Sequence, residues 1–264
     1  SAWAWRERMR ATTSSMRASR ASSSPDWVGV MWRPPVVVGP PVSHAVRGCA
    51  CARGRAGRLS SVNEQYFTDQ APASDAEARQ LRVSARGHEL TMRVSPKVFS
   101  ASRLDLGTRQ LLAEAPELPG RGTLLDLGCG WGPLAVVMGL ESPGASVWAV
   151  DVNTRALDLT ERNAGANGAA NVSAMDAGEA LERARSEGVR FDAIWSNPPV
   201  RVGKEAMRRM LSDWLSLLAP GGAAYLVVQR NLGADSLVAW LVSQGMAARR
   251  YASKKGYRII EVTA

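Results

Sequence analysis

The chain is poor in the residues that build metal centres, disulfide frameworks and membrane spans. It has three cysteines and two histidines among 264 residues. Cys49 and Cys51 form one Cys-x-Cys without a second pair, and His44 and His88 have no spacing that suggests a partner. Neither a metal site nor a disulfide framework is therefore expected. No run of about 18 apolar residues occurs, so no transmembrane helix and no membrane partner are expected.

Positive charge is concentrated at the start of the chain. The formal net charge is +9. Residues 1–61 contain ten Arg, no Lys and two acidic residues, which gives +8, whereas residues 62–264 contain 23 Lys or Arg and 22 Asp or Glu, which gives +1. The later part is nearly neutral, so the overall charge by itself predicts no RNA binding.

Residues 1–61 are predicted to form a disordered basic extension rich in Arg, Ser and Pro. They show no sustained period of 2 or 3.6 and cannot bury enough apolar surface to offset the entropy of ordering. Three origins are open: a transit-like targeting segment, a basic RNA-tethering arm, or a translated upstream extension with the native start near Val62. The third is favoured because four of the nine Trp fall in this stretch, which suits an unselected sequence.

Residues 62–264 are predicted to form one α/β domain, with a lead-in at 62–118 and a catalytic core at 119–264. In the lead-in, strands are expected at 80–86 and 89–94 around Gly87-His88, followed by a helix at 106–115. From residue 122 onward, strands alternate with helices, as is typical of a mostly parallel sheet with helices on both faces. Strands are expected at 123–127, 146–152, 171–175, 191–196 and 223–229, and helices at 132–140, 154–167, 204–218 and 236–244. A final antiparallel hairpin at 247–251 and 257–262 distinguishes the pattern from a pure dinucleotide fold.

A glycine-rich turn links the first core strand to the first core helix. Residues 126–132 read Asp-Leu-Gly-Cys-Gly-Trp-Gly, and glycines permit positive φ and close approach of a ligand to the backbone. Pyrophosphate sites have Gly-x-Gly-x-x-Gly instead, and Asp126 would repel a pyrophosphate but pair with an ammonium group. S-adenosylmethionine carries an ammonium group and no phosphate, so the turn favours this cofactor.

Two further acidic residues stand at the ends of the next strands. Asp151 comes 25 residues after Asp126, where its carboxylate can accept hydrogen bonds from both ribose hydroxyls. Asp176 follows the third core strand, where its side chain could reach an adenine amino group. Each acid has a plainer interpretation, as a cap, a turn residue or a solvated loop acid. Because all three acidic residues stand at the ends of successive strands, together they favour a cofactor site.

The segment 191–199 places Asn197 at the end of the fourth core strand, followed by Pro198 and Pro199. Ligands of open α/β sheets bind at such strand ends. The prolines fix φ and hold Asn197 extended, so its side-chain oxygen and the Pro198 carbonyl are expected to be free acceptors. An exocyclic amine is a poor nucleophile because its lone pair is delocalised into the ring. Two acceptors on its hydrogens would favour a pyramidal nitrogen and stabilise the developing charge.

These motifs resemble those of the class I methyltransferases in the "methyltransferase small" domain family, which include bacterial ribosomal-RNA guanine-N2 methyltransferases. The similar segments are Val98-Phe99-Ser100, Leu104 to Thr108, the turn at 126–132, Asp151, and the octet Asn-Pro-Pro-Val-Arg-Val-Gly-Lys at 197–204. The resemblance covers about residues 64 to 264 and implies a Rossmann-like fold with a seven-stranded, mostly parallel sheet. It also implies that Phe99 to Thr108 cover the methionine end of the cofactor, and that Asn197 and Pro198 hold the target amine.

The expected site combines three groups of residues. Asn197, Pro198 and Pro199 are the expected catalytic residues. Expected cofactor contacts are Phe99, Thr108, Asp126, Gly128, Cys129, Gly130, Gly132, Asp151, Val152, Asp176, Ala177 and Asn197. Val200, Arg201 and Lys204 are the expected RNA contacts, with Arg208 and Arg209 extending that face. A solvated helix face is the alternative interpretation of these cations.

The sequence departs from the family pattern in two ways. Val200 stands where many relatives have an aromatic residue that stacks on the target base, and the resemblance covers one methyltransferase-like half where the longer ribosomal-RNA enzymes have two. The expected function is methyl transfer from S-adenosylmethionine to an exocyclic amino nitrogen of an RNA base, with guanine N2 preferred. Ribosomal RNA or a ribosomal subunit is the expected partner, and the cytoplasm the expected location.

Two alternative functions remain open. The first is a protein methyltransferase acting on a glutamine amide, against which Val200 counts because such enzymes usually have Asn-Pro-Pro-Tyr. The second is a non-catalytic RNA-binding module with a relic cofactor pocket. The intact acids at 126 and 151 and the intact Asn-Pro-Pro count against it.

Overall fold

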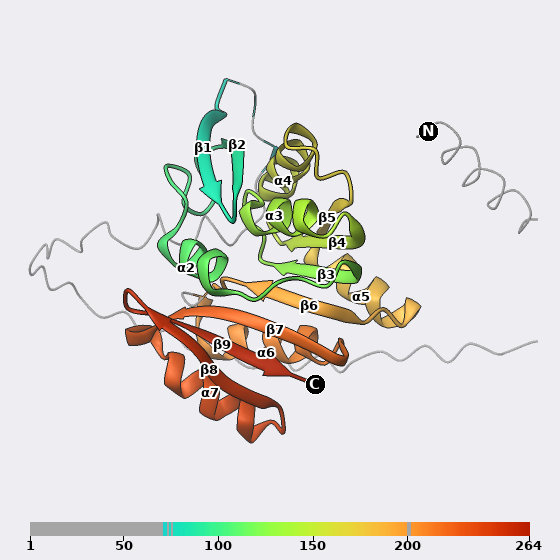
Figure 1. The fold of residues 1–264 in the computed structure, drawn as a ribbon, viewed down its shortest axis with the longest axis vertical. Helices are drawn as coiled ribbons and strands as arrows, with labels where there is room; N and C mark the ends of the chain where they lie inside the picture. The colour runs from blue at the N-terminus through green and yellow to red at the C-terminus, as the bar shows by residue number, and fades with distance from the viewer. Residues whose placement is uncertain (1–70, 73, 75, 200–201) are drawn as a thin grey trace, which may run out of the picture. The chain divides into compact units, whose positions relative to one another are not determined.

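A seven-stranded sheet forms the centre of the part of the chain that a computed structural model describes, residues 71–72, 74, 76–199 and 202–264 (Figure 1). Its strand order is β5-β4-β3-β6-β7-β9-β8. The strands are β3 (Arg121–Leu127), β4 (Gly144–Asp151), β5 (Val172–Asp176), β6 (Phe191–Ser196), β7 (Leu218–Gln229), β8 (Ala247–Lys254) and β9 (Tyr257–Thr263). Strands β3 to β7 pair in parallel, and β9 is antiparallel to both β7 and β8. This confirms the predicted mostly parallel sheet with a terminal antiparallel hairpin.

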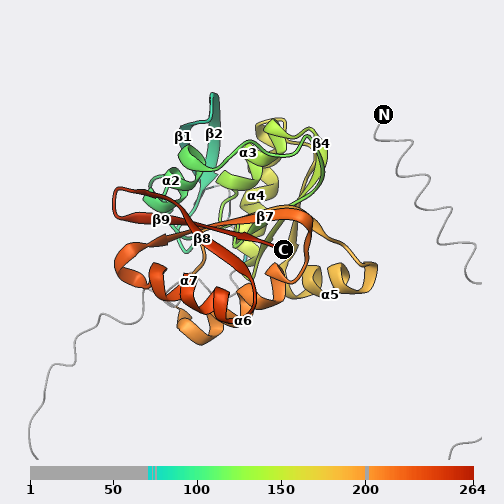
Figure 2. The same cartoon turned by 60° about the horizontal axis from the view of Figure 1, so that its bottom comes forward.

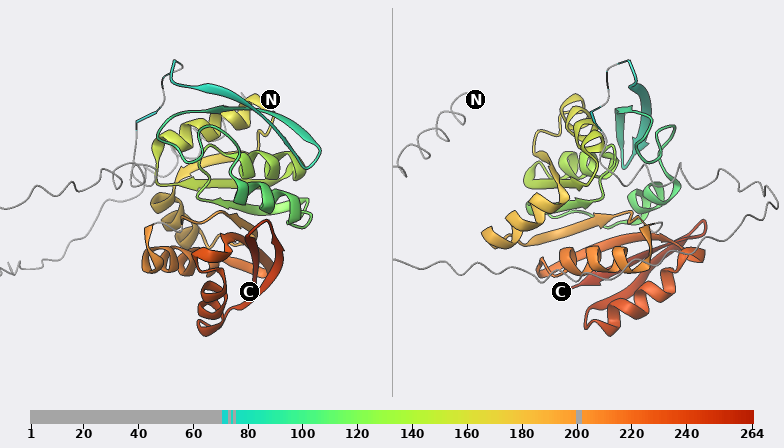
Figure 3. Two further views of the ribbon diagram at one scale, coloured as in Figure 1. Left: turned by 90° about the vertical axis from the view of Figure 1, so that its left-hand side faces the viewer. Right: turned by 180° about the vertical axis from the view of Figure 1, so that it is seen from behind.

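Helices cover both faces of the sheet, as the alternation predicts. Figure 2 shows the two groups on opposite sides, and Figure 3 shows them from two further directions. The first group is α2 (Leu106–Glu114), α3 (Pro133–Glu141) and α4 (Thr154–Ala166); the second is α5 (Ala177–Glu187), α6 (Lys204–Leu215) and α7 (Ala234–Ser243). Along β3, Leu124 packs into the core under the first group, whereas Leu125 packs under the second. The two apolar faces explain why the strands read as nearly continuous hydrophobic runs.

Two elements differ from the sequence-based prediction. Helix α5 was missed because its buried face consists of small residues, Ala180 and Ala184, which give a weak helical period. Strand β7 begins at Leu218 and includes the Pro-Gly-Gly segment that was expected to separate a helix from a strand. Its pairing with β6 has an irregular register there. The strand can continue through this segment because Gly222 has no side chain. A Cβ there would lie 2.7 Å from the carbonyl oxygen of Phe191 in the neighbouring strand.

The first 61 residues, predicted to be a disordered extension, lie outside the described residues, as do Val200 and Arg201. In the described part, no helix has both the length and the apolar character needed to cross a membrane. Within the same residues, no group of three or more His, Cys, Asp or Glu is placed to hold a metal ion.

A hairpin precedes the sheet and packs beside α4 (Figure 1). It consists of β1 (Arg79–Ala85) and β2 (His88–Val94). Its turn residues are Arg86 and Gly87, with φ of 51° and 81°, one position earlier than predicted. Arg86 tolerates positive φ because its guanidinium is anchored: it pairs with Glu141 at 2.6 Å and donates to carbonyls at the end of α2. A cation at a helix carboxyl terminus is favourable.

Two asparagines on α4 attach this hairpin to the core. Asn163 accepts a hydrogen bond from the backbone N–H of Arg93 and donates to its carbonyl, and Asn167 does the same with Thr91. The asparagines lie one helical turn apart and therefore match alternate residues of β2. Asn163 is fully buried and also donates to the carbonyl of Trp131 in the glycine-rich turn, at 2.8 Å.

We predict that Asn163→Ala lowers the free energy of unfolding by about 2–4 kcal/mol, because it leaves buried backbone groups without partners. Urea denaturation of the full chain measures this loss. Asn167→Ala is the matched control and should cost less, since its bonds to β2 are exposed to water. Equal destabilisation by the two variants would contradict this explanation.

Candidate functional site

A cavity of about 470 Å³ lies at the carboxyl ends of the parallel strands. Its wall is built from the segments that follow β2, β3, β4, β5, β6 and β7, with Tyr257 of β9 completing it. Among the described residues, the charged side chains that line it are Asp105 and Asp151, and no Lys, Arg or His does so. Such a wall favours a cationic or neutral ligand over a phosphate.

The glycine-rich turn forms one side of this cavity. Gly128 and Gly130 line it with φ of 78° and 58°, a backbone conformation that side chains disfavour. A Cβ on either glycine would meet no other atom within 4 Å, so their backbone faces open space. The turn is fixed to the end of β4, because Gly128 N donates to the Val150 carbonyl and Gly130 N donates to Asp151 Oδ2, both at 2.9 Å.

Two other predicted cofactor residues of the turn have packing roles. Gly132 does not line the cavity; it precedes α3, and a Cβ there would lie 2.8 Å from Thr160 Oγ1. Cys129 lines the cavity, and its buried sulfur lies 3.5 Å from the Thr160 hydroxyl. Burial raises the pKa of this thiol well above its usual value, so it remains protonated and is no nucleophile.

Asp126 lies one layer behind the turn rather than at the cavity surface. It is fully buried, and its Oδ2 accepts a hydrogen bond from Ala135 N at 2.9 Å. Its Oδ1 has no hydrogen-bond partner among the described residues. Burial raises the pKa of this carboxyl to about 8; the bond from Ala135 opposes the shift, and the charge of Asp151 adds to it. A nearby cation would favour the ionised form.

We predict that Asp126→Asn makes the ligand-free protein less sensitive to pH. A carboxyl whose folded-state pKa is raised contributes stability at acid pH, and this contribution is lost as the pH rises through its folded pKa, about 8 here. Between about pH 5 and pH 7, the wild type should lose roughly 1.4 kcal/mol per pH unit relative to the variant. Urea unfolding at both values tests this, and parallel pH profiles would refute it.

The end of β4 places Asp151 at the cavity wall. Asp151 Oδ2 accepts from Gly130 N and Oδ1 accepts from Asn153 N at 3.0 Å, so both oxygens are oriented and each keeps a lone pair for a ligand. Burial raises the pKa of Asp151, with the two hydrogen bonds opposing the shift. Val152 and Ala177 also line the cavity, and Val152 is half exposed. Asp176 does not line it; its Oδ1 caps α5.

Asn197 directly follows β6 and lines the cavity together with Pro198 and Pro199. Its Nδ2 donates to Asp105 Oδ2 at 2.9 Å and to Thr108 Oγ1 at 3.0 Å. Asp105 is the N-cap of α2, and the same Oδ2 accepts from Thr108 N at 3.1 Å. Thr108 was named among the predicted cofactor residues, whereas Asp105 was predicted only as part of the segment that covers the methionine end of the cofactor, with no contact to Asn197. Its position directly before a helix was the available signal.

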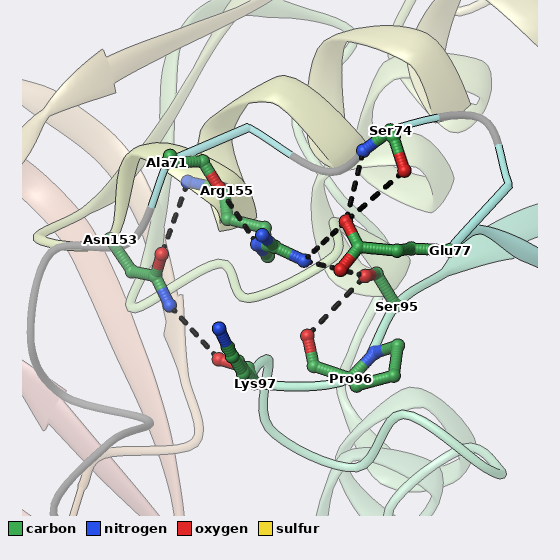
Figure 4. A network of polar contacts seen from close by, with 8 residues as sticks. All are labelled: Ala71, Ser74, Glu77, Ser95, Pro96, Lys97, Asn153 and Arg155. Atoms are coloured by element: carbon green, nitrogen blue, oxygen red, sulfur yellow. Dashed lines mark hydrogen bonds and ion pairs between the residues drawn. The ribbon is translucent and has the colours of Figure 1, made fainter.

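Residues 95–97, just before the predicted methionine-end segment, are held against the start of α4 by a polar network (Figure 4). The buried guanidinium of Arg155 pairs with Glu77 at 3.2 Å and donates to Ser95 Oγ and the carbonyl of Ala71. Asn153, the N-cap of α4, donates to the Lys97 carbonyl at 3.3 Å. A hydrogen bond from Ser74 and the charge of Arg155 lower the pKa of Glu77. Phe99 follows two residues after Lys97 and lines the cavity.

Several lining residues were not predicted, among them Trp214, Gln229, Leu232 and Tyr257. They lie between residues 214 and 257, after the Asn-Pro-Pro octet, where the sequence shows ordinary amphipathic elements and no motif. Lys204, a predicted RNA contact, does not line the cavity; it is exposed at the first turn of α6.

Comparison with known proteins places these features in a family. A family model described as the methyltransferase small domain matches residues 89–261. The chain belongs to the methyltransferase small domain family. This agrees with the resemblance found in the sequence. The match includes the glycine-rich turn, Asp151 and Asn197, and it ends within β9.

Members of the methyltransferase small domain family resemble the chain over different lengths. Protein YbxB of Bacillus subtilis is 28% identical over 202 residues, which are 76% of this chain and 98% of that protein. Ribosomal RNA small subunit methyltransferase C of Hahella chejuensis is 43% identical over 142 residues, which are 52% of this chain and 40% of that protein. The same-named protein of Pseudomonas aeruginosa is 33% identical over 71% of this chain and 58% of its own length. The chain thus spans less than two thirds of these ribosomal RNA methyltransferases.

The chain is also similar to a solved methyltransferase structure. The 16S rRNA N2 G1207 methyltransferase (RsmC) of T. thermophilus, in complex with AdoMet and guanosine, superposes with a TM-score of 0.60 and 27% identity. The match covers 74% of this chain and 53% of that one. The fold of this methyltransferase small domain is therefore that of a class I methyltransferase.

Proposed function

We propose that the chain transfers a methyl group from S-adenosylmethionine to an exocyclic amino nitrogen of an RNA base, with guanine N2 of ribosomal RNA as the first candidate. The observation that carries the proposal is the cavity itself, which joins the acidic glycine-rich turn to Asn197 and Pro198 and contains no cationic lining residue in the described part. Residues 62–264 would form the catalytic domain, with 1–61 outside it. The cytoplasm, where bacterial ribosomal RNA is found, is the expected location.

The residues at the turn fit this cofactor, which supplies an electrophilic methyl group on a sulfonium. The two oriented oxygens of Asp151 would accept the ribose hydroxyls, and Val152 and Ala177 would flank the adenine. Buried Asp126, whose Oδ1 has no hydrogen-bond partner among the described residues, would ionise beside an ammonium group and stabilise it there. A contact of Asp176 with the adenine amino group stays a prediction, since one of its oxygens already caps α5.

The protein's part in the chemistry is to hold the amine. Asn197 Oδ1 and the Pro198 carbonyl would accept its two hydrogens and turn the nitrogen lone pair toward the methyl carbon. The nitrogen–carbon bond forms as the carbon–sulfur bond breaks, the bonding electrons return to sulfur, and the surplus proton passes to water. Oxygens fixed before the reaction stabilise the positive charge that develops on nitrogen. Position and electrostatics suffice, without a nucleophilic side chain.

Apolar side chains at the cavity suit a flat, neutral target. Phe99, Val152, Val202 and Leu232 are exposed and line the cavity. Tyr257 also lines it and is partly buried. Base stacking on an aromatic ring contributes roughly 1–3 kcal/mol. Because Val200 is not aromatic, Tyr257 is the candidate for this contact.

Replacement of the amine-holding residue tests the proposal. Asn197→Ala should lower methyl transfer to unmodified ribosomal RNA by about 10²–10³-fold, the range for loss of one preorganised polar stabiliser. Transfer of label from S-adenosylmethionine measures the rate, and calorimetry should show a far smaller loss in cofactor affinity than in rate.

Asn167→Ala is the control, because Asn167 contacts β2 and does not line the cavity. It should methylate RNA like the wild type. A rate for Asn197→Ala within a few-fold of wild type would exclude the proposed role. Label in protein instead of RNA would point to a glutamine amide as the target, and absence of cofactor binding to a non-catalytic module.

Cations stand at the rim although none lines the cavity in the described part. Arg103, Lys204, Arg230 and Lys255 are exposed, and each lies within two positions of a lining residue. None of them pairs with an acidic residue among the described residues. Phosphate contacts on the RNA backbone would position the substrate without specifying its sequence.

We predict that Lys204→Ala weakens RNA binding and reduces the slope of log affinity against log salt by about 0.7–0.9, the effect of one phosphate contact. Filter binding at several salt concentrations measures the slope. Arg190→Ala is the control, because Arg190 precedes β6 at the opposite edge of the sheet. If Lys204→Ala and the wild type have the same slope, Lys204 does not contact a phosphate of the RNA.

A further inference from the structure

We infer that Asp105 is a positioning residue that sets the orientation of the Asn197 amide, so that its oxygen, and not its NH₂ group, faces the target. The inference deepens the proposed function and rests on it for the identity of the target. It concerns a side chain that neither the glycine-rich turn nor the Asn-Pro-Pro motif includes.

The two ends of the Asn197 amide have different chemistry, and their neighbours distinguish them. One end is an acceptor and the other carries two donors. Asp105 Oδ2 lies 2.9 Å from the amide nitrogen and Thr108 Oγ1 lies 3.0 Å from it, so both hydrogens are bonded. Rotation of the amide by half a turn would set its oxygen against a carboxylate oxygen, and two acceptors repel. The amide oxygen is left without a donor among the described residues.

Asp105 is itself held in place. Its Oδ2 also accepts from Thr108 N at 3.1 Å as the N-cap of α2, and α2 packs on β7 and β9. The absence of a side chain at Gly107 leaves space for the Asp105 carboxylate. A Cβ there would lie 2.9 Å from Asp105 Oδ2 and 3.0 Å from Tyr257 Cε1. The oxygen that orients Asn197 is therefore fixed by a backbone donor and confined by neighbouring elements.

This arrangement has a consequence for the substrate class. An amide oxygen that faces the cavity can only accept a hydrogen bond, so it holds a target that carries a hydrogen, such as an exocyclic amine. A ring nitrogen without a hydrogen, or a carbonyl oxygen of a base, would gain nothing from it. Asp105 thus contributes to the choice of the methylated atom without contacting the substrate.

Two replacements separate the orienting bond from the helix cap. Asp105→Ser keeps a good N-cap, but the shorter side chain ends before it can reach Asn197. Asp105→Asn can keep an oxygen at the position of Oδ2, held there by Thr108 N. We expect Asp105→Ser to lower kcat by about 10- to 100-fold, the range for a hydrogen bond to a charged group, because the amide of Asn197 loses the partner that orients it. Asp105→Asn should restore most of kcat.

A double-mutant cycle shows whether Asp105 acts through Asn197. In an Asn197→Ala background, Asp105→Ser should cause no further loss of kcat, because there is no amide left to orient. Equal losses by Asp105→Ser in the two backgrounds would overturn the inference. So would a kcat for Asp105→Asn as low as that of Asp105→Ser.

The same cycle measured by urea unfolding, without RNA or cofactor, separates this inference from the proposed function. Asp105→Ser and Asn197→Ala should destabilise less together than the sum of their separate effects. If the wild type methylates no RNA but this coupling is present, the proposed function fails and the contact stands. If the wild type methylates RNA but Asp105 and Asn197 show no coupling, the proposed function stands and the role of Asp105 is excluded.

Discussion

Buried carboxyl groups that have no cationic partner among the described residues, at the carboxyl edge of the sheet, are the constraint on which the site depends. Asp126 is buried with one oxygen lacking a partner, and Asp151 reaches the cavity with both oxygens oriented by backbone N–H groups. Both carboxyls have raised pKa values because burial disfavours their charge. Such a site is stabilised by a cation, and the sulfonium and ammonium groups of S-adenosylmethionine meet that need. A phosphate-bearing cofactor would add to the repulsion.

The second half of the cavity depends on segments that are distant in the sequence. Asn197 follows the fourth core strand, but its partners Asp105 and Thr108 belong to the lead-in helix α2. The lead-in must therefore dock accurately on the core. Buried polar side chains achieve this, because Asn163 and Arg155 satisfy backbone and side-chain groups of the hairpin and its flanks. Directional hydrogen bonds fix position where apolar packing alone would permit sliding.

The sequence predicted the parts of the fold that carry strong local signals. The apolar strand β6 was predicted with its observed boundaries, and the order of parallel strands before a terminal hairpin is as expected. The prediction failed where the signal is small or depends on tertiary contacts. Helix α5 has an apolar face made of alanines, and β7 continues through a Pro-Gly-Gly segment because the neighbouring strand accepts a close approach. Local propensity contains no information about that neighbour.

In the site, too, the sequence predicted the residues that carry local signals and missed those placed by tertiary contacts. Motifs located Asp151, the glycine-rich turn and Asn197, because each lies at the end of a predicted strand. They could not separate Gly128, which lines the cavity, from Gly132, which packs on Thr160. Tyr257 was missed because its strand carries no motif, and its place in the wall follows from the pairing of β9 with β7.

The rim of the cavity carries positive charge, whereas its lining is acidic. The described lining is acidic where it is charged, whereas exposed Arg and Lys stand just outside it. A nucleic acid needs both: its phosphates require cations, and its target base must enter a pocket that already holds a cationic donor. Cations inside the cavity would repel the sulfonium, and acids alone at the rim would repel the backbone. Under the proposed function, exposed Lys204 outside the cavity would meet a phosphate, while Asn197 at the cavity wall would meet the target base.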